Sequence, residues 1–228
     1  MTYSHTQLQD PASPTIANLI NFYNPSIITI TIIIIYVIFR KLRFHLTQPA
    51  SISPASENHE LEVLWTIAPG LILITLALPS LQLLYSIEET INPKLIIKIT
   101  GHQWYWSYDY ARVDNLEFDS FIIPTNELNS RNLRLLETDN RIVTPWALER
   151  RLLLSSADVL HAWTLPNIGV KADAVPGRIN QIIINPIKIG VFYGQCSEIC
   201  GANHSFIPIT IEVIPHTKWA KWISSHTK

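Results

Sequence analysis

The stretch GQCSEICGANHSFIPI, residues 194–209, brings together four side chains that can bind a metal ion. Two thiols, a carboxylate and an imidazole lie within nine positions, at Cys196, Glu198, Cys200 and His204. A further imidazole, His161, follows an apolar segment earlier in the chain. Soft thiolates combined with imidazoles select copper, zinc or an iron cluster. These residue types therefore predict a metal site on loops.

The spacing of these donors leaves several kinds of site open. A mononuclear blue copper site needs one thiolate, whereas a second thiolate in the same loop allows both sulfurs to bridge two metal ions. Two cysteines and two histidines would also complete a tetrahedral zinc site. Alternatively, Cys196 and Cys200 could form a small disulfide, and His161 could be a buried core histidine.

Two long apolar runs indicate a membrane anchor. Residues 11–39 contain no formal charge over 29 positions, and residues 63–87 contain none over 25. Each run exceeds the roughly 20 residues that a helix needs to cross a bilayer core. We therefore expect an outer N-terminal segment at 1–18, transmembrane helices at 19–39 and 63–87, and an inner loop at 40–62.

The charges beside the two runs predict their orientation. Lysine and arginine gather at 40–43, directly after the first run, whereas Glu88 and Glu89 follow the second. The positive-inside rule places the loop on the inner side and both termini outside. No basic or arginine-rich leader precedes Arg40, so we expect neither a signal peptide nor a transit peptide. The chain also has no basic patch suited to nucleic acid.

Residues 92–228 show a pattern typical of an all-β domain. Short segments rich in β-branched and aromatic residues alternate with proline, glycine, asparagine and aspartate, which favours a sandwich or barrel. The last segment instead predicts a short amphipathic helix, with Trp219 and Trp222 on one face. The expected strands lie within 95–110, 133–139, 150–166, 178–186, 189–195 and 207–215.

Several long motifs resemble one family. GHQWYWSYDY, SSADVLHAWTLP, VKADAVPGRINQ and FYGQCSEICGANHSF are similar to motifs of subunit 2 of mitochondrial cytochrome c oxidase. The resemblance covers nearly the whole chain, including ELEVLWTIAPG at the start of the second apolar run. Bacterial quinol oxidase relatives lack the paired cysteines. The resemblance implies a membrane helical hairpin followed by a cupredoxin-like domain.

The resemblance also implies a metal centre. His161 and His204 would each bind one copper ion, and the thiolates of Cys196 and Cys200 would bridge the two ions. Glu198 would offer its main-chain carbonyl to copper and its carboxylate to a magnesium ion shared with subunit 1. Two coppers that share one electron change geometry little on reduction, and short loops on a β scaffold hold that geometry.

The same resemblance implies a route for electrons and protons. Cytochrome c would deliver electrons near Trp104, and the copper centre would pass them to haem a in subunit 1. There oxygen would be reduced to water with proton pumping. Glu62, at the inner end of the second run, would open one proton pathway. The chain would lie in the mitochondrial inner membrane, with its copper domain and both termini in the intermembrane space.

A cluster of acidic residues has two interpretations. It could be an ordinary solvated face, as the aromatic residues of 104–110 could be ordinary strand packing. With the resemblance, the acids would form the docking face for basic cytochrome c, because complementary charge raises the association rate and fixes orientation. The residues of this expected face are Asp109, Asp114, Glu117, Asp119, Asp139 and Asp158.

Position 207 departs from the family pattern. The family has a methionine thioether there as a weak axial copper ligand, whereas this chain has Ile207. An isoleucine would leave copper bound but alter its potential, because axial ligands tune blue-type sites. The chain contains 35 isoleucines and one methionine. We therefore also hypothesise that AUA codons, read as methionine in many mitochondria, are written here as isoleucine.

Two further functions compete with the electron-transfer hypothesis. A membrane-anchored copper carrier for oxidase assembly also pairs two cysteines with a distant histidine, but usually has one membrane span and a thioredoxin-like pattern. A zinc-stabilised structural anchor would be colourless. The two spans, His204 after the second cysteine and the aromatic run favour the oxidase subunit.

Overall fold

The structure is a computed structural model that describes residues 8–47, 57–88, 93–111, 113 and 116–226. The chain divides into two compact units. One unit comprises Met1–Ala17 with Ile87–Lys228, and the other comprises Asn18–Ser86.

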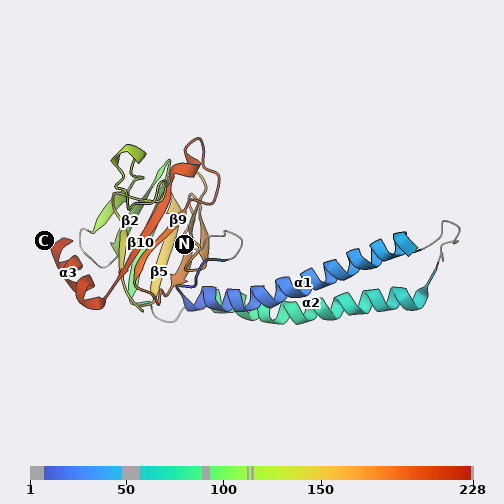
Figure 1. Cartoon of the computed structure of the whole chain (residues 1–228). Helices are drawn as coiled ribbons and strands as arrows, with labels where there is room; N and C mark the ends of the chain where they lie inside the picture. Colours follow the sequence, from blue (N-terminus) through green and yellow to red (C-terminus); the bar gives the residue numbers. More distant parts are fainter. Residues whose placement is uncertain (1–7, 48–56, 89–92, 112, 114–115, 227–228) are drawn as a thin grey trace. The chain divides into compact units, whose positions relative to one another are not determined.

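Two long helices carry the apolar runs (Figure 1). Helix α1 spans Pro14–Thr47 and helix α2 spans His59–Glu88. Both helices are longer than the apolar runs, so residues 40–47 and 59–62 of the expected inner loop are helical. Each contains a strongly apolar window of which none is buried within the described chain. Such length and exposed apolar surface are what a bilayer-spanning helix requires.

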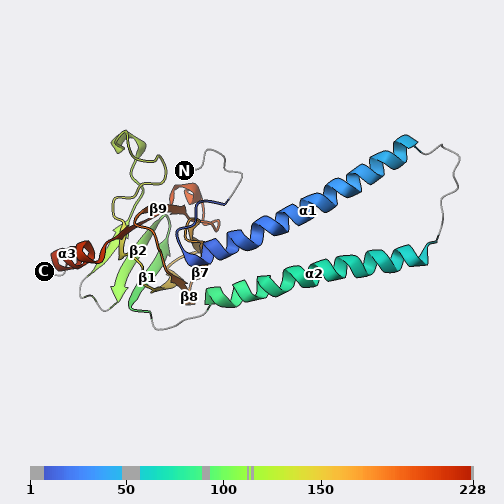
Figure 2. The same ribbon diagram turned by 60° about the horizontal axis from the view of Figure 1, so that its bottom comes forward.

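The β domain contains two main sheets and a hairpin, seen from two directions in Figures 1 and 2. One sheet has the order β3-β2-β1-β5-β8, the second has the order β4-β10-β9, and β6 pairs with β7. The strands are β1 Leu95–His102, β2 Tyr105–Ala111, β3 Glu117–Ser120, β4 Ile142–Pro145, β5 Arg150–Ser156, β6 His161–Leu165, β7 Val170–Ala174, β8 Asn180–Ile184, β9 Gly190–Gln195 and β10 Pro208–Ile214.

Alternating side chains of these strands build the core. In β2, Trp106, Tyr108 and Tyr110 are at most 1% exposed, and Trp163 of β6 is fully buried. Because successive residues of a strand point to opposite faces, the intervening residues of β2 face outward. Large buried aromatic side chains supply much of the stability of such a core. The expected aromatic packing of β2 is thus observed.

One expected strand is wrong. Residues 133–139 form turns, and only Thr138 makes an isolated bridge, to Ile122. Leu135 adopts a left-handed conformation, with φ of 66°. A strand cannot pass through such a residue, because left-handed backbone is incompatible with an extended ladder. The other expected strand segments contain strands, and the structure adds β3, β4 and β7.

The C-terminal segment forms the expected helix, α3, at His216–His226. The rings of Trp219 and Trp222 stack with centroids 5.2 Å apart. Both rings also pack against Tyr110, with centroids 6.0 Å (Trp219) and 5.7 Å (Trp222) from the centroid of the tyrosine ring. One face of α3 therefore closes the end of the core.

The segment before α1 is held by the β domain. The main chain of Ala12 donates to the carbonyl of Asn167 and accepts from the N–H of Ile187, both at 2.8 Å. The Ser13 hydroxyl donates to the Ile168 carbonyl at 2.6 Å. Ile16 is 2% exposed. These contacts join residues far apart in sequence.

Candidate metal centre

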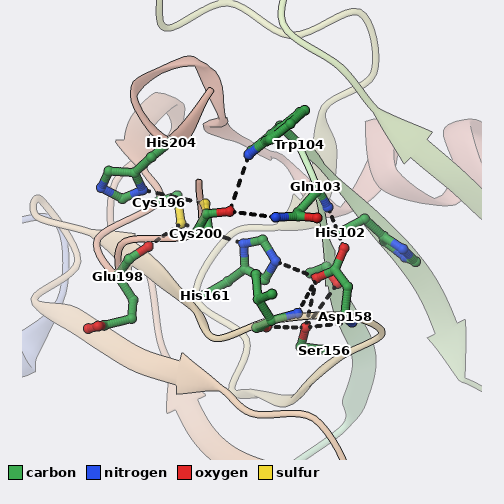
Figure 3. A network of polar contacts seen from close by, with 12 residues as sticks. His102, Gln103, Trp104, Ser156, Asp158, His161, Cys196, Glu198, Cys200 and His204 are labelled. Carbon is green, nitrogen blue, oxygen red and sulfur yellow. Dashed lines mark hydrogen bonds and ion pairs between the residues drawn. The ribbon is translucent and has the colours of Figure 1, made fainter. Parts of the chain in front are cut away.

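Three short segments bring the predicted donors together (Figure 3). His161 is the first residue of β6, and Cys196 and Cys200 lie in the loop that follows β9. His204 begins the 3-10 helix His204–Phe206, just before β10. The N–H of Cys196 donates to the carbonyl of Ile207 at 3.0 Å, which closes this loop at its base.

The donor atoms converge. The ligand atoms of His161, Cys196 and Cys200 all lie within 4.8 Å of one another. Nδ1 of His161 is 3.9 Å from Sγ of Cys196, and Nδ1 of His204 is 3.5 Å from Sγ of Cys200. Both cysteines are buried and carry free thiols, so the small-disulfide alternative is wrong for this structure.

Glu198 presents its two ends to different surroundings. Its main-chain carbonyl accepts a hydrogen bond from Sγ of Cys196 at 3.4 Å. Its carboxylate points away from the sulfur atoms in Figure 3. The carbonyl is therefore placed beside the donor cluster, whereas the carboxylate is directed away from it.

His161 is oriented from behind by a carboxylate. The imidazole is fully buried, and its Nε2 lies 2.8 Å from Oδ1 of Asp158. This contact directs Nδ1 toward Cys196, in the way that second-shell carboxylates fix metal-binding histidines. A Cβ atom on Gly101 would lie 2.8 Å from Cδ2 of His161, so the ring requires glycine there.

Burial and neighbouring groups shift the pKa values of the cluster in different directions. Burial alone would lower the pKa of His161, but its hydrogen bonds to Cys196 and Asp158 raise it overall. Burial would raise the pKa of Cys196, but the His161 imidazole lowers it overall. Burial and the charge of Cys196 raise the pKa of Cys200. Both thiols therefore ionise together only when a nearby cation compensates.

Trp104 connects the surface to the cluster. Its side chain is partly buried, and its Nε1–H donates to the carbonyl of Cys200 at 3.3 Å. The neighbouring Gln103 donates its side-chain N–H to the same carbonyl at 2.8 Å. Trp104 therefore lies beside the site.

The expected acidic face is divided in the structure. Asp109 pairs with Lys98 at 2.7 Å and lies beside Glu117 on the next strand. Asp119 is exposed on β3. Asp139 accepts hydrogen bonds from the main-chain N–H groups of Phe121 and Asn140.

Two of the expected acidic residues need separate mention. Asp158 is engaged by His161 within the site. Asp114 lies outside the described residues. Glu117, Asp119 and Asp139 thus remain the members of the set that are exposed and make no ion pair in the described chain.

Glu62 lies in the first turn of α2. Its carboxylate is half exposed and lies 3.9 Å from Nδ1 of His59. Asn58 caps this helix by accepting from the N–H of Leu61 at 3.0 Å. A carboxylate in a first turn is stabilised by the helix dipole, which gives Glu62 a structural role whatever else it does.

Ile207 is 1% exposed and belongs to the same buried cluster as Cys196 and Cys200. Its side chain is aliphatic and offers no lone pair. The donors present are thus two thiols, two imidazoles and the carbonyl of Glu198, which is a soft set that suits copper or zinc.

Family models match both parts of the chain. The model for the periplasmic domain of cytochrome c oxidase subunit II matches residues 95–214. The model for its transmembrane domain matches residues 2–83. The chain belongs to the cytochrome c oxidase subunit II family.

Solved structures resemble the β domain of this subunit II chain. The periplasmic domain of subunit II of cytochrome oxidase (CoxB) of Bradyrhizobium japonicum is 43% identical, with a TM-score of 0.56, and the match covers 60% of this chain and 96% of that chain. A subunit II domain in a mixed disulfide with a thioredoxin-like TlpA is 42% identical, with a TM-score of 0.53, and the match covers 61% of this chain and 94% of that chain.

These matches fix the general character of the protein. It is a membrane protein with two transmembrane helices and an outer-side cupredoxin-like domain, and it is a subunit of a haem-copper terminal oxidase. The His161, Cys196 and Cys200 cluster is consistent with a copper A type site. Family membership and the sheet order argue against the copper-carrier hypothesis, because that hypothesis predicts a thioredoxin-like fold.

Sequence reasoning missed three contributions to the site. Asp158 was assigned to a docking face but orients His161. Gly101 and Gln103 had no predicted role. The motif GHQW contains both residues, and a glycine next to polar residues at the end of a strand was the signal for close backbone approach.

Proposed function

We propose that this chain is the electron-accepting subunit of a mitochondrial cytochrome c oxidase. In this proposal His161, Cys196, Cys200 and His204 hold a dinuclear copper centre, with the Glu198 carbonyl as a further ligand. The convergence of two free thiols with His161 within 4.8 Å carries the proposal. Bound there, the copper pair would supply a one-electron carrier between cytochrome c and haem a of subunit 1.

The protein contributes rigidity. The N–H of Ser197 donates to the carbonyl of Ala162 at 3.0 Å, which ties the cysteine loop to β6. Asp158 fixes the ring of His161 from behind. Donors held in this way change position little, and preorganisation of this kind keeps the cost of each electron transfer small.

Trp104 supports the proposed route by which electrons arrive. It is partly buried and hydrogen-bonded to the Cys200 carbonyl, so a partner at the surface reaches the cluster through a single side chain. The exposed Glu117 and Asp119 give that partner an acidic surface. A basic cytochrome c fits this charge, because complementary potential speeds and orients association. From subunit 1 the electrons would reduce oxygen to water with proton pumping.

Three finer roles belong to the same proposal. The outward-pointing carboxylate of Glu198 would bind a magnesium ion shared with subunit 1. Glu62, half exposed at the start of α2, would open a proton pathway. The segments 1–18 and 92–228 would lie in the intermembrane space, with the loop between the helices in the matrix.

Copper loading of the full chain in detergent tests the metal centre. We expect two coppers per chain and an electron paramagnetic resonance signal from one unpaired electron shared by both. Cys200→Ser should lose the shared signal, whereas Ser197→Ala, a change beside the same cysteines, should retain it. A colourless chain that retains zinc in preference to copper would contradict the proposal.

Salt dependence tests the docking face. Replacing Glu117 and Asp119 by Gln and Asn should reduce the association rate with cytochrome c about tenfold at low salt and flatten its salt dependence. Asp173→Asn, at an exposed position on β7, is the matched control. Equal salt dependence in the control and the double variant would exclude this face.

A further inference from the structure

We propose that Gln103 is a positioning residue that braces the two metal-binding loops against each other. The β1–β2 turn that carries Gln103 contributes no ligand to the cluster. The two loops come from distant parts of the chain, before β6 and after β9. Gln103 bonds to both of them (Figure 3). The proposal rests on the proposed copper centre.

The first contact of the brace uses the main chain. The N–H of Gln103 donates to Oδ2 of Asp158 at 2.6 Å. The other carboxylate oxygen, Oδ1, lies 2.8 Å from Nε2 of His161. One carboxylate therefore joins the turn to the imidazole. Any movement of Gln103 relative to this loop changes the direction in which Nδ1 of His161 points.

The second contact uses the side chain. Nε2 of Gln103 donates to the main-chain carbonyl of Cys200 at 2.8 Å, and the Trp104 indole approaches the same oxygen at 3.3 Å. A Cβ atom on Gly201 would lie 3.2 Å from Nε2 of Gln103, and Gly201 has a φ of +122°. The glycine after Cys200 thus allows the amide to approach and lets the chain turn there.

The brace has a consequence for the metal. Donors from two separate loops keep their mutual distance more firmly when both loops are also tied to a common support. The β1–β2 pair supplies that support, since its strands pair over seven positions from Ile96 to His102. Loss of one contact loosens one loop relative to the other, with the bond between Ser197 and Ala162 still in place. The mutual position of His161 and the cysteines then fluctuates, and copper is held less firmly.

The test uses Gln103→Met in the full chain, because methionine has a similar length and no hydrogen-bond donor. We expect copper release to a chelator to become about tenfold faster, from the loss of one hydrogen bond. We also expect unequal sharing of the unpaired electron between the coppers. Gln195→Met, an exposed position next to Cys196, is the control. Gln103→Asn, whose amide is one methylene short, should give the same change with less disturbance of packing.

A copper-free readout separates a brace from a local contact. Hydrogen exchange should speed up in Gln103→Met both at residues 157–163 and at residues 195–204, which lie far apart in sequence. The double variant Gln103→Met with Asp158→Asn should release copper more slowly than the product of the two single effects predicts, because both changes weaken the same support.

The outcomes distinguish the brace from the copper centre itself. If the parent chain fails to bind two coppers with a shared electron, the proposed function fails. If the parent binds them but both Gln103 variants match Gln195→Met in release rate, spectrum and exchange, the brace is wrong. The brace would also be wrong if the copper release rate of the double variant showed the full product of the two single effects.

Discussion

Glu137 and Arg150 are two buried charged residues of the same β domain that differ in their hydrogen-bond partners. Glu137 is 3% exposed, and its carboxylate accepts from the Tyr193 hydroxyl at 2.8 Å and from Arg141 at 2.9 Å. Arg150 is fully buried at the start of β5. Its three guanidinium nitrogens have no hydrogen-bond partner within the described chain.

The difference shows what burial of charge demands. Burial alone would raise the pKa of Glu137, but its hydrogen bonds lower it overall, so the ionised form is favoured. Burial lowers the pKa of Arg150 to about 9, because little opposes the loss of solvation. A compensated buried charge is tolerated, whereas an unpaired one costs several kcal/mol. Of these two buried charges, that of Glu137 is compensated and that of Arg150 is not.

The strongest test of this comparison is Arg150→Leu. Removing the unpaired guanidinium from an apolar site should raise the free energy of unfolding of the copper-free chain by about 3 kcal/mol. Urea unfolding of the full chain in detergent, followed by tryptophan fluorescence, measures the change. Arg151→Leu, the next and less buried residue, is the control and should change the value far less. A less stable Arg150→Leu protein would mean that the guanidinium has a partner after all.

Glu137→Gln should act in the other direction. It removes the charge that Arg141 and Tyr193 contact, so the free energy of unfolding should fall by about 2 kcal/mol. The same urea experiment measures it, with Glu127→Gln, in the exposed 3-10 helix Thr125–Glu127, as the control. Equal stability of the two variants would contradict the view that Glu137 is a stabilising centre.

Acid should weaken the parent chain through Glu137. Because the pKa of Glu137 is lower in the folded state than its ordinary value of 4.5, its stabilisation is complete above that pH. It is lost as pH falls through the folded pKa. Unfolding free energies measured from pH 6 to pH 3 should thus decline less steeply in Glu137→Gln than in the parent. Parallel curves would show that this carboxylate has the same pKa in both states.

Tyr193→Phe sharpens the account of Glu137 by removing one donor. The carboxylate keeps Arg141 and the N–H of Leu133. The loss should therefore be about 1 kcal/mol, less than for Glu137→Gln. Thermal unfolding of the copper-free chain is the measurement. A loss as large as that of Glu137→Gln would mean that the phenol, and not the ion pair, holds this network together.

Ile207→Met shows how much the free energy of unfolding changes at a buried position that carries no charge. A change between apolar residues of similar volume should cost less than about 1 kcal/mol. It would add a thioether beside the proposed copper ligands and so shift the copper potential. Voltammetry and unfolding of the same sample measure both. Peptide mass spectrometry of the natural protein tests the codon hypothesis. Finding isoleucine at position 207 would contradict that hypothesis.

The elements of this fold follow from periodicity where the pattern is long. The two apolar runs, the alternating residues of β1 and β2, and the paired tryptophans of α3 all predicted what the structure contains. Leu133–Asp139 was mispredicted, because adjacent leucines gave strand composition without alternation, and Leu135 turns left-handed. Local composition cannot show this, since the turn is held by contacts with distant residues such as Thr210, which donates to the Leu136 carbonyl.

The metal donors were predictable because their types and spacing are distinctive. The residues that hold these donors in place could not be predicted. Asp158 looked like one surface acid among several, and only the fold brings its carboxylate to His161 and Gln103. Similarly, the sequence contains two successive arginines at 150 and 151, and nothing in the pair tells which one points into the core. Such assignments depend on strand register, which is set by tertiary pairing.

The attachment of the N-terminal segment to the β domain also governs how the chain is made. Ser13 bonds to a carbonyl 155 residues further along, so its partner is synthesised long after it. The start of α1 must therefore reach the side of the membrane on which the β domain folds. It remains without its Ile168 partner until that residue has been synthesised. Because that segment ends up within the domain that follows α2, the intervening chain crosses the bilayer an even number of times. The outer domain can therefore be completed only after both helices have been inserted.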